Sequence, residues 1–292
     1  MQAIDLSKAS IDRIQLQLLQ EKKVELQVLR LDKIHPIISG NKWFKLKYHL
    51  ENYAVQKCDG ILTFGGAWSN HIIATASICA QQKIKSVGIV RGERPTILSN
   101  TLQMAEELGM QLQFISRENY KQKDSFYVNE LRKQFPNFYF IPEGGTGETG
   151  EAGASEILDL VNKESYTHFV CAIGTGTMFR GICKASTSTQ KIVGIEVLKG
   201  LKSTTKQLST TIINGEYHFG GYAKYNTELI NFMNIFYAET KIPTDFVYTG
   251  KLFFAVLELL KKDQFPPGSK LLTIHSGGLQ GNASLQKGML QF

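Results

Sequence analysis

The sequence predicts an α/β fold with mostly parallel sheets, and three observations lead to this class. From about residue 60 onward, short β-rich segments alternate with helical stretches, which is the pattern of consecutive βαβ units. Several of the β-rich segments end in Gly-rich turns, where open α/β sheets bind ligands. The chain has 292 residues, enough for two lobes, because single cores stop growing near this size.

The predicted strands are short runs rich in β-branched and aromatic residues. They cover residues 61–64, 86–90, 111–115, 138–141, 169–173, 191–197 and 270–275. A helix is predicted to begin at Ser69, because a serine behind a turn is a natural N-cap. Further helices are predicted over residues 98–108, 153–161, 178–185, 227–238 and 251–262. Lys42 is predicted to follow an extended stretch and to precede a helix.

Composition and charge argue against several classes of function. With 42% hydrophobic and 20% charged residues, the chain has an ordinary globular composition. Its net charge of +7 comes from lysines and arginines spread along the chain, so we interpret it as a solvated basic surface and expect no nucleic-acid partner. The longest apolar run, residues 252–260, contains Glu258 and is too short to cross a bilayer, so we expect no membrane partner.

The cysteines and the first residues predict a cytoplasmic protein. Cys58, Cys79, Cys171 and Cys183 form no C-x-x-C pair and have no metal-ligand spacing. We therefore expect buried, reduced thiols and no metal site. The first residues lack the apolar run of a secretion signal and carry Asp5.

Gly174-Thr175-Gly176-Thr177 has the features of a phosphate site. It follows a predicted strand and opens a predicted helix, so it offers free backbone N–H groups, two hydroxyls and a helix N-terminus. No G-K-[ST] follows, and Thr177-Met178-Phe179 stands where a dinucleotide fingerprint has its third glycine, so nucleotides are disfavoured. The alternative is an ordinary tight turn that needs glycine for its backbone angles.

Ser69-Asn70-His71 begins a second predicted helix, behind Gly65-Gly66. Backbone N–H groups, a hydroxyl and an amide would converge there on a spot that suits a carboxylate. The alternative is simple capping by Ser69, with His71 as an incidental polar residue. Together with a phosphate site, this spot makes Lys42 a candidate for a lysine that holds an aldehyde cofactor, although most lysines only solvate a surface.

Six motifs, taken in chain order, resemble the 1-aminocyclopropane-1-carboxylate deaminase and D-cysteine desulfhydrase family. They are Ser39-Gly40-Asn41-Lys42-x-x-Lys45-Leu46, Gly65-Gly66-x-x-Ser69-Asn70-His71, Pro142-Glu143-Gly144-Gly145, Gly174-Thr175-Gly176-Thr177, Tyr248-Thr249-Gly250-Lys251 and Ser276-Gly277-Gly278. The resemblance covers nearly the whole chain from about residue 30. It implies the tryptophan-synthase-β-like fold of type II pyridoxal 5′-phosphate enzymes, with the cofactor in a cleft between a larger lobe (1–47 with 153–292) and a smaller lobe (48–152).

The resemblance also implies roles for single residues. Lys42 would be the lysine that forms the Schiff base with the cofactor, and Lys45 would lie near the cofactor phosphate. The phosphate loop would be Gly174, Thr175, Gly176 and Thr177. Asn70 would meet the hydroxyl of the cofactor ring.

The substrate would be a small amino acid, and the protein is expected to form a homodimer. Its carboxylate would bind at Ser69, Asn70 and His71. Besides Lys42 and Ser69, the catalytic residues would include Tyr248 and, in Gly221-Tyr222-Ala223, Tyr222.

Thr249 and Ser276 suggest which reaction the cofactor serves. In the deaminases of this family, the residue after the tyrosine is a glutamate that faces the pyridine nitrogen and favours a protonated ring. A neutral threonine gives a weaker electron sink, which suffices to eliminate a thiolate but not to open a cyclopropane. Ser276, where deaminases have leucine, also favours a D-cysteine desulfhydrase-like α,β-elimination.

Three activities thus remain open. The preferred one is a lyase or hydrolase that converts a small amino acid to pyruvate, ammonia and sulfide. The second is deamination of 1-aminocyclopropane-1-carboxylate to 2-oxobutanoate and ammonia. The third is a non-catalytic protein that binds a phosphorylated ligand, against which Lys42, Asn70 and Tyr248 argue, because phosphate binding needs none of them.

Overall fold

The described part of the chain forms two separate sheets. The computed structural model describes residues 3–121, 126–199 and 210–292. The larger sheet has the strand order β1-β2-β10-β7-β8-β9, in which only β1 runs antiparallel to its neighbour. The smaller sheet is parallel throughout, with the order β5-β4-β3-β6. This confirms the predicted α/β class with mostly parallel sheets.

The strands of the larger sheet are β1 (Ser10–Arg13), β2 (Glu25–Arg30), β7 (His168–Ile173), β8 (Lys191–Glu196), β9 (Thr211–Asn214) and β10 (Lys270–His275). Those of the smaller sheet are β3 (Gly60–Gly65), β4 (Lys85–Arg91), β5 (Met110–Ile115) and β6 (Phe138–Ile141). The central strands β3 and β7 are buried along their whole length, as is typical of parallel strands covered on both faces.

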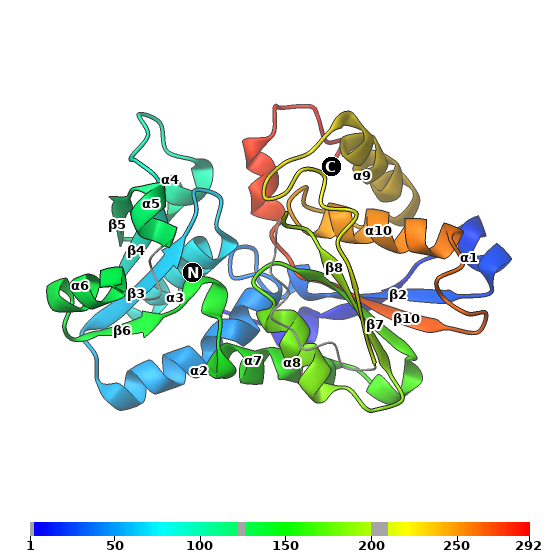
Figure 1. The fold of residues 1–292 in the computed structure, drawn as a ribbon, viewed down its shortest axis with the longest axis horizontal. Helices are drawn as coiled ribbons and strands as arrows, with labels where there is room; N and C mark the ends of the chain where they lie inside the picture. The colour runs from blue at the N-terminus through cyan, green and yellow to red at the C-terminus, as the bar shows by residue number, and fades with distance from the viewer. Residues whose placement is uncertain (1–2, 122–125, 200–209) are drawn as a thin grey trace.

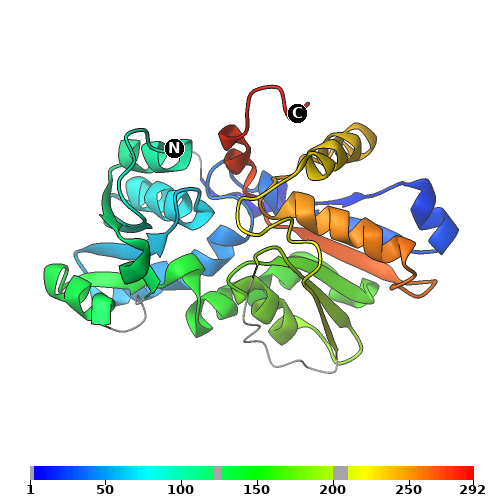
Figure 2. The ribbon, with the colours of Figure 1, turned by 45° about the horizontal axis from the view of Figure 1, so that its top comes forward.

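Helices cover both faces of each sheet. They are α1 (Gln17–Lys22), α2 (Asn41–Gln56), α3 (Asn70–Gln82), α4 (Asn100–Glu107), α5 (Arg117–Lys121), α6 (Phe126–Gln134), α7 (Glu148–Ser155), α8 (Thr177–Ala185), α9 (Thr227–Thr240) and α10 (Thr249–Lys261). The α9 and α10 helices lie on one side of the larger sheet and α7 and α8 on the other (Figures 1 and 2). In the smaller sheet, α3 and α4 pack on one face and α5 and α6 on the other.

Short 3-10 helices join several of these elements. They cover Leu6–Lys8, Leu31–Lys33, Glu143–Gly145, Glu156–Leu160, Lys163–Ser165 and Leu279–Ser284. Leu279–Ser284 contacts α4, where the Asn100 side chain donates to the carbonyl of Ala283 at 3.2 Å. This turn therefore connects the C-terminal part of the chain to the smaller sheet (Figure 1).

Most predicted elements are present within a few residues of their predicted bounds, and the region around α7 is the main correction. The predicted helix over residues 153–161 instead begins at Glu148 and ends at Ser155, followed by the 3-10 turn Glu156–Leu160. A Cβ on Gly153 would lie 1.8 Å from the carbonyl oxygen of Phe44. Glycines that look like helix breakers in the sequence thus let α7 pack directly against α2.

The structure adds strands and helices that the sequence did not predict, namely β1, α1, β2, α5, α6 and β9. The strands of the larger sheet come from residues 10–30 and 168–275, and those of the smaller sheet come from residues 60–141. The exact lobe boundaries, 1–47 with 153–292 and 48–152, stay a prediction. Of the four free cysteines, Cys79 and Cys171 are buried, whereas Cys58 and Cys183 are only partly so.

Candidate active site

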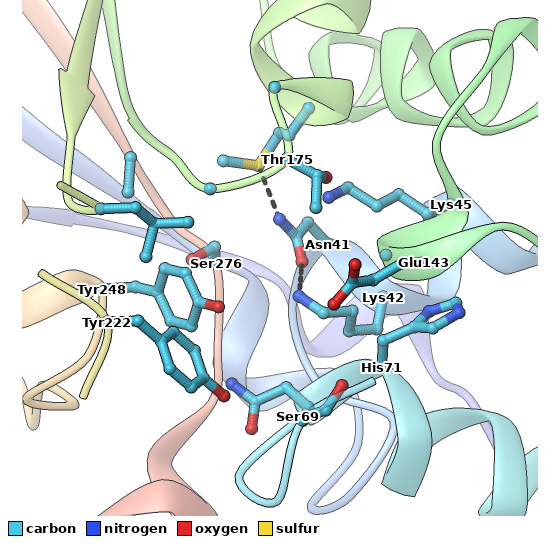
Figure 3. A pocket seen from close by; sticks show the side chains of 18 of the residues that line it. Asn41, Lys42, Lys45, Ser69, His71, Glu143, Thr175, Tyr222, Tyr248 and Ser276 are labelled. Carbon is cyan, nitrogen blue, oxygen red and sulfur yellow. Dashed lines mark hydrogen bonds between the residues drawn. The ribbon is translucent and has the colours of Figure 1, made fainter. Parts of the chain in front are cut away.

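A cavity of about 320 Å³ contains nearly all of the predicted site residues (Figure 3). The residues that line it come from the first turn of α2, the start of α3, the turn before α8 and the C-terminal ends of β7 and β10. The N-terminal ends of α2, α3 and α8 supply unpaired N–H groups and partial positive charge, which suit a ligand that carries anionic groups. The predicted residues in its lining are Lys42, Lys45, Ser69, Asn70, His71, Gly174, Thr175, Gly176, Tyr222, Tyr248 and Ser276. Thr177 and Thr249 are not in the lining.

Lys42 is the second residue of α2, so it lies inside the helix that it was predicted to precede. Its ammonium donates to the Asn41 side-chain oxygen at 2.6 Å. Removal from solvent lowers the pKa of Lys42 to about 8, and the charge of Asp245 opposes that shift. In Figure 3, the amine lies between Tyr222 and Tyr248 on one side and Glu143 on the other.

The start of α2 is fixed by direct contact with the end of β10. Gly40 has a φ of 64°, and a Cβ there would lie 1.8 Å from the carbonyl oxygen of Ser276. The N–H of Asn41 donates to that same carbonyl at 3.3 Å, and the N–H of Gly278 donates to the Ser39 hydroxyl at 3.2 Å. Only glycine meets both demands at residue 40, so the Ser-Gly-Asn-Lys motif is what brings Lys42 to the cavity.

Lys45 is one helical turn further along and is only 5% exposed. Within the described residues, the structure gives its amine neither a hydrogen bond nor an ion pair. Burial and the nearby charges of Lys42 and Arg180 hold the pKa of Lys45 well below its usual range. A buried amine without a partner is costly unless a ligand supplies the counter-charge.

The turn from Gly174 to Gly176 provides a place for such an anion beside Lys45 (Figure 3). Gly176, with a φ of 82°, is the N-cap of α8, so backbone N–H groups of the first turn point toward the cavity. The hydroxyls of Thr175 and Thr177 lie 3.1 Å apart. Thr177 is fully buried and contacts the turn from behind, which explains its absence from the cavity lining.

Two residues after this turn had no predicted role. Met178 is buried, and its sulfur accepts a hydrogen bond from Asn41 at 3.2 Å, so it orients the neighbour of Lys42. Arg180 forms an ion pair with Glu151, which also pairs with Lys184 at 2.7 Å. The guanidinium of Arg180 lies close behind Gly176 and adds positive charge to the turn.

Ser69 and Asn70 keep polar groups available to a ligand at the start of α3. The Ser69 hydroxyl oxygen caps α3 by accepting from the N–H of Ile72 at 3.2 Å, which leaves its own proton free for a ligand. The side-chain oxygen of Asn70 accepts from Gln280 at 3.0 Å. This bond orients Asn70 so that its NH₂ group remains a donor, as a cofactor ring oxygen would require.

The side chain of His71 does not fit a carboxylate. The Thr63 hydroxyl donates to the carbonyl of Ile141 at 2.8 Å, so it must accept from Nε2–H of His71, also 2.8 Å away. Burial and the charges of Lys42 and Lys45 hold the pKa of His71 well below its usual range, so the ring is neutral. Nδ1 is then an acceptor, and within the described residues it has no partner. His71 can offer a carboxylate only its backbone N–H.

Tyr222 and Tyr248 lie next to each other at one wall of the cavity (Figure 3). Gly174 permits this arrangement, because a Cβ there would lie 3.1 Å from the Tyr248 ring. Burial raises the pKa of both phenols, for Tyr248 well above its usual range. Both hydroxyls are therefore neutral proton donors at physiological pH.

Thr249 is fully buried, and its hydroxyl donates to the carboxylate of Asp245 at 2.7 Å. The same oxygen accepts from the N–H of Asp245 at 2.7 Å. The structure thus directs Thr249 into its own turn and not into the cavity, unlike the ring-facing position that the resemblance implied. The residue still contributes no carboxylate to this wall.

Arg91 and Glu143 also line the cavity, although neither was predicted to do so. Arg91 ends β4, and its guanidinium lies 5.9 Å from the centre of the Tyr120 ring. Glu143 directly follows β6 and Pro142. Their signal in the sequence is their position after strands of a parallel sheet, at the edge where ligands bind.

Pyridoxal phosphate fits this site on three observations. Lys42 is a lysine with a lowered pKa, Lys45 is a buried amine without a counter-charge, and the turn before α8 is an anion cradle next to it. In the described residues, no group of three or more His, Cys, Asp or Glu could hold a metal ion. The described helices also include none with the length and apolar character needed to cross a membrane.

Comparison with known proteins gives matches over most of the chain. A putative 1-aminocyclopropane-1-carboxylate deaminase of Pyrococcus furiosus is 27% identical, over 87% of this chain and 85% of that protein. A bifunctional D-cysteine desulfhydrase/1-aminocyclopropane-1-carboxylate deaminase of Arabidopsis thaliana, a mitochondrial protein, is 29% identical, over 88% of this chain and 73% of that protein.

A solved structure confirms the fold. The crystal structure of a homologue of 1-aminocyclopropane-1-carboxylate deaminase matches with a TM-score of 0.79 at 23% identity, over 96% of this chain and 92% of that one. The model of the pyridoxal-phosphate dependent enzyme family matches residues 14–277. The chain therefore belongs to the pyridoxal-phosphate dependent enzymes and has the type II fold that its motifs implied.

Proposed function

We propose that this enzyme eliminates the β-substituent of a small amino acid, with D-cysteine converted with water to pyruvate, ammonia and hydrogen sulfide. The observation that carries the proposal is Thr249, a neutral residue whose hydroxyl proton is bonded to Asp245. The cavity wall beside Tyr248 therefore receives no carboxylate from position 249, and the weaker electron sink expected there favours the less demanding elimination over opening of a cyclopropane. This is a lyase reaction, so the hydrolase class is set aside.

Binding and orientation come from three parts of the site. The N–H groups at the start of α8 and the amine of Lys45 hold the phosphate of the cofactor, and the NH₂ group of Asn70 meets its ring oxygen. The substrate carboxylate binds the Ser69 hydroxyl and the backbone N–H groups at the start of α3. When bound, pyridoxal phosphate supplies the electron sink for the bond broken at the α-carbon.

Proton transfer is assigned to Lys42, and hydrogen bonding of the leaving group to the two tyrosines. Lys42 in its neutral form accepts the α-proton, because its pKa of about 8 lies near the operating pH of a general base. Tyr222 and Tyr248 keep their protons at this pH and hydrogen-bond the departing sulfur. One water molecule then hydrolyses the eliminated product to pyruvate and ammonia.

The pH dependence of cofactor uptake tests whether the pKa of the Lys42 amine is lowered. Only the neutral amine attacks the aldehyde, so the rate constant of uptake by cofactor-free protein should rise about tenfold per pH unit below 8 and level off above it. Stopped-flow absorbance from pH 6 to 10 measures it. An inflection near 10.5, the value of an ordinary lysine, would show that burial does not tune this amine.

The second candidate function is deamination of 1-aminocyclopropane-1-carboxylate, which the names of the relatives from Pyrococcus furiosus and Arabidopsis thaliana favour. An assay of pyruvate and 2-oxobutanoate with D-cysteine, L-cysteine and 1-aminocyclopropane-1-carboxylate separates the two. We expect kcat/KM for D-cysteine to be at least about tenfold higher, a difference of about 1.4 kcal/mol in transition-state binding. A higher value for the cyclopropane substrate would reverse the order of the two functions.

Ser276 offers a matched variant for this assay. Ser276 lines the cavity and is 7% exposed. The other position that distinguishes the deaminases, residue 249, is less suitable for substitution, because a glutamate there would meet the carboxylate of Asp245. Ser276→Leu should therefore change the ratio of the two activities without disturbing the turn that holds Tyr248. Ser284→Leu, on the 3-10 turn Leu279–Ser284 and outside the cavity lining, is the control and should leave the ratio unchanged.

Assembly and location also remain proposals. The expected homodimer can be tested by sedimentation of the purified protein across a range of concentrations. The expected cytoplasmic location requires fractionation of the source cells.

A further inference from the structure

The loop that carries Tyr222 holds two non-glycine residues in the left-handed region of φ. It lies between β9 and α9, and four residues next to Tyr222 have positive φ. They are Phe219 at 50°, Gly220 at 89°, Gly221 at 111° and Ala223 at 53°. Phenylalanine and alanine adopt such angles only where the surrounding structure imposes them. Within the loop, the N–H of Gly221 donates to the carbonyl of His218 at 2.9 Å and the N–H of Lys224 to the carbonyl of Gly221 at 3.2 Å. A residue outside the loop must provide the remaining support for these backbone angles.

Lys251 is the residue that does so. Its side chain is fully buried, and its ammonium donates to the carbonyls of Gly221 at 2.7 Å, His218 at 2.9 Å and Val197 at 3.4 Å. These three acceptors match the three protons of an ammonium group. Among the described residues, no carboxylate lies within ion-pair distance of it.

The pKa of Lys251 shows that burial of its ammonium group is unfavourable. Burial lowers its pKa to about 8, and the charge of Asp245 only partly opposes that shift. An apolar side chain of the same length would fill the space without burying a charge. The lysine differs from an apolar side chain in its hydrogen bonds to the three carbonyls, and one of these carbonyls belongs to Gly221, directly before Tyr222.

Tyr248 is held at the start of the same helix by a second buried group. The carboxylate of Asp245 accepts from the N–H groups of Val247 at 3.0 Å, Tyr248 at 2.9 Å and Thr249 at 2.9 Å. The first turn of α10 therefore fixes Tyr248 through Asp245 and the Tyr222 loop through Lys251. The positions of both tyrosines therefore depend on the start of α10, although Tyr222 is distant from this helix in sequence.

We propose that Lys251 is a positioning residue, which sets the place of the Tyr222 hydroxyl beside Tyr248 by bonding the carbonyls of the loop that carries Tyr222. The inference rests on the proposed function, because it assumes that Tyr222 acts in turnover. It predicts that loss of Lys251 removes the contribution of Tyr222 and little else.

A kinetic double-mutant cycle on the holoenzyme tests this dependence. It compares Lys251→Met, which keeps the length of the side chain, with Tyr222→Phe and with the double variant, using D-cysteine or the best substrate of the panel. We expect each single variant to lose about 10²-fold in kcat, in the range of a lost proton donor. The double variant should fall no more than about twofold below Tyr222→Phe. The visible absorbance of the bound cofactor should not change, because Lys42 and the phosphate turn are untouched.

Lys262→Met is the matched control. Lys262 follows the same helix, is exposed, and donates to the Tyr217 hydroxyl at 3.0 Å, so its kcat should equal that of the wild type. If Lys251→Met gives no soluble protein, Lys251→Gln replaces it in the cycle. Glutamine retains two N–H donors and should show a smaller loss of kcat that Tyr222→Phe again masks.

Two outcomes would overturn the inference, and they differ from each other. Multiplied losses in the double variant would show that Lys251 acts independently of Tyr222, while the role of Tyr222 stands. Full kcat in Tyr222→Phe would remove the role proposed for Tyr222 in catalysis, and the inference with it.

Discussion

Lys42→Ala protein is expected to show no visible absorbance of lysine-bound cofactor and to lose at least about 10³-fold in kcat. Lys42 combines the two properties that the chemistry needs, an amine that can be neutral near pH 8 and a position inside the cavity between Tyr222, Tyr248 and Glu143. Alanine removes both the attachment of the cofactor and the acceptor of the α-proton. Absorbance spectra of the purified protein and a pyruvate assay measure the two losses separately.

Two further variants make this experiment specific. Lys42→Arg keeps a positive charge but offers no neutral amine, so it should fail as Lys42→Ala does. Lys47→Ala, on the same helix, breaks a partly exposed pair with Glu156, which is worth at most about 1 kcal/mol, and a contact with the Tyr48 ring, both outside the cavity. It should keep its absorbance and its turnover. Activity in Lys42→Arg would mean that the charge of residue 42 matters and its nucleophilicity does not.

Lys45→Met is expected to change cofactor affinity and protein stability in opposite directions. In the cofactor-free protein the amine of Lys45 is buried without a partner, so its removal should raise the free energy of unfolding by about 1 kcal/mol or more. With cofactor present, the variant lacks a buried counter-charge for the phosphate, a loss of about 2–5 kcal/mol. The Kd for pyridoxal phosphate should rise between about 30-fold and several thousand-fold.

Thermal unfolding without cofactor and a titration with pyridoxal phosphate measure the two effects. The pH dependence of the free energy of unfolding provides a further test. A lysine whose folded pKa lies below 10.5 destabilises the folded state at low pH, and this penalty disappears as pH rises toward 10.5. The cofactor-free wild-type protein should therefore become more stable as the pH rises from the folded pKa of Lys45 toward 10.5, and Lys45→Met should gain less stability over this range. Equal cofactor affinity in both proteins would place the phosphate elsewhere.

Local signals made much of the fold predictable. Ser69 caps α3 as expected, because the N-cap depends on one side chain and the residue three positions later. The strand over residues 168–173 is apolar along its length, which is how a strand buried on both faces looks in a sequence. The Gly-rich turn at Gly174 follows from its place between a strand and a helix.

Features that depend on distant contacts were not predictable in the same way. The glycines of α7 look like breaks, and only their contact with α2 explains why a helix forms there. Thr249 was predicted to face the cofactor, but its hydroxyl is bonded to Asp245 in a turn that no local pattern reveals. Arg91 and Glu143 reach the cavity through the order of the strands, which the sequence does not state.

Borohydride reduction of the holoenzyme, followed by mass mapping of its tryptic peptides, tests most directly whether Lys42 holds the cofactor. Reduction fixes the cofactor to its lysine and prevents cleavage by trypsin after that residue. We predict a phosphopyridoxyl group on Lys42 and unmodified Lys45 and Lys251. A phosphopyridoxyl group on Lys45 or Lys251, or a protein without any phosphopyridoxyl group, would contradict the assignment of Lys42.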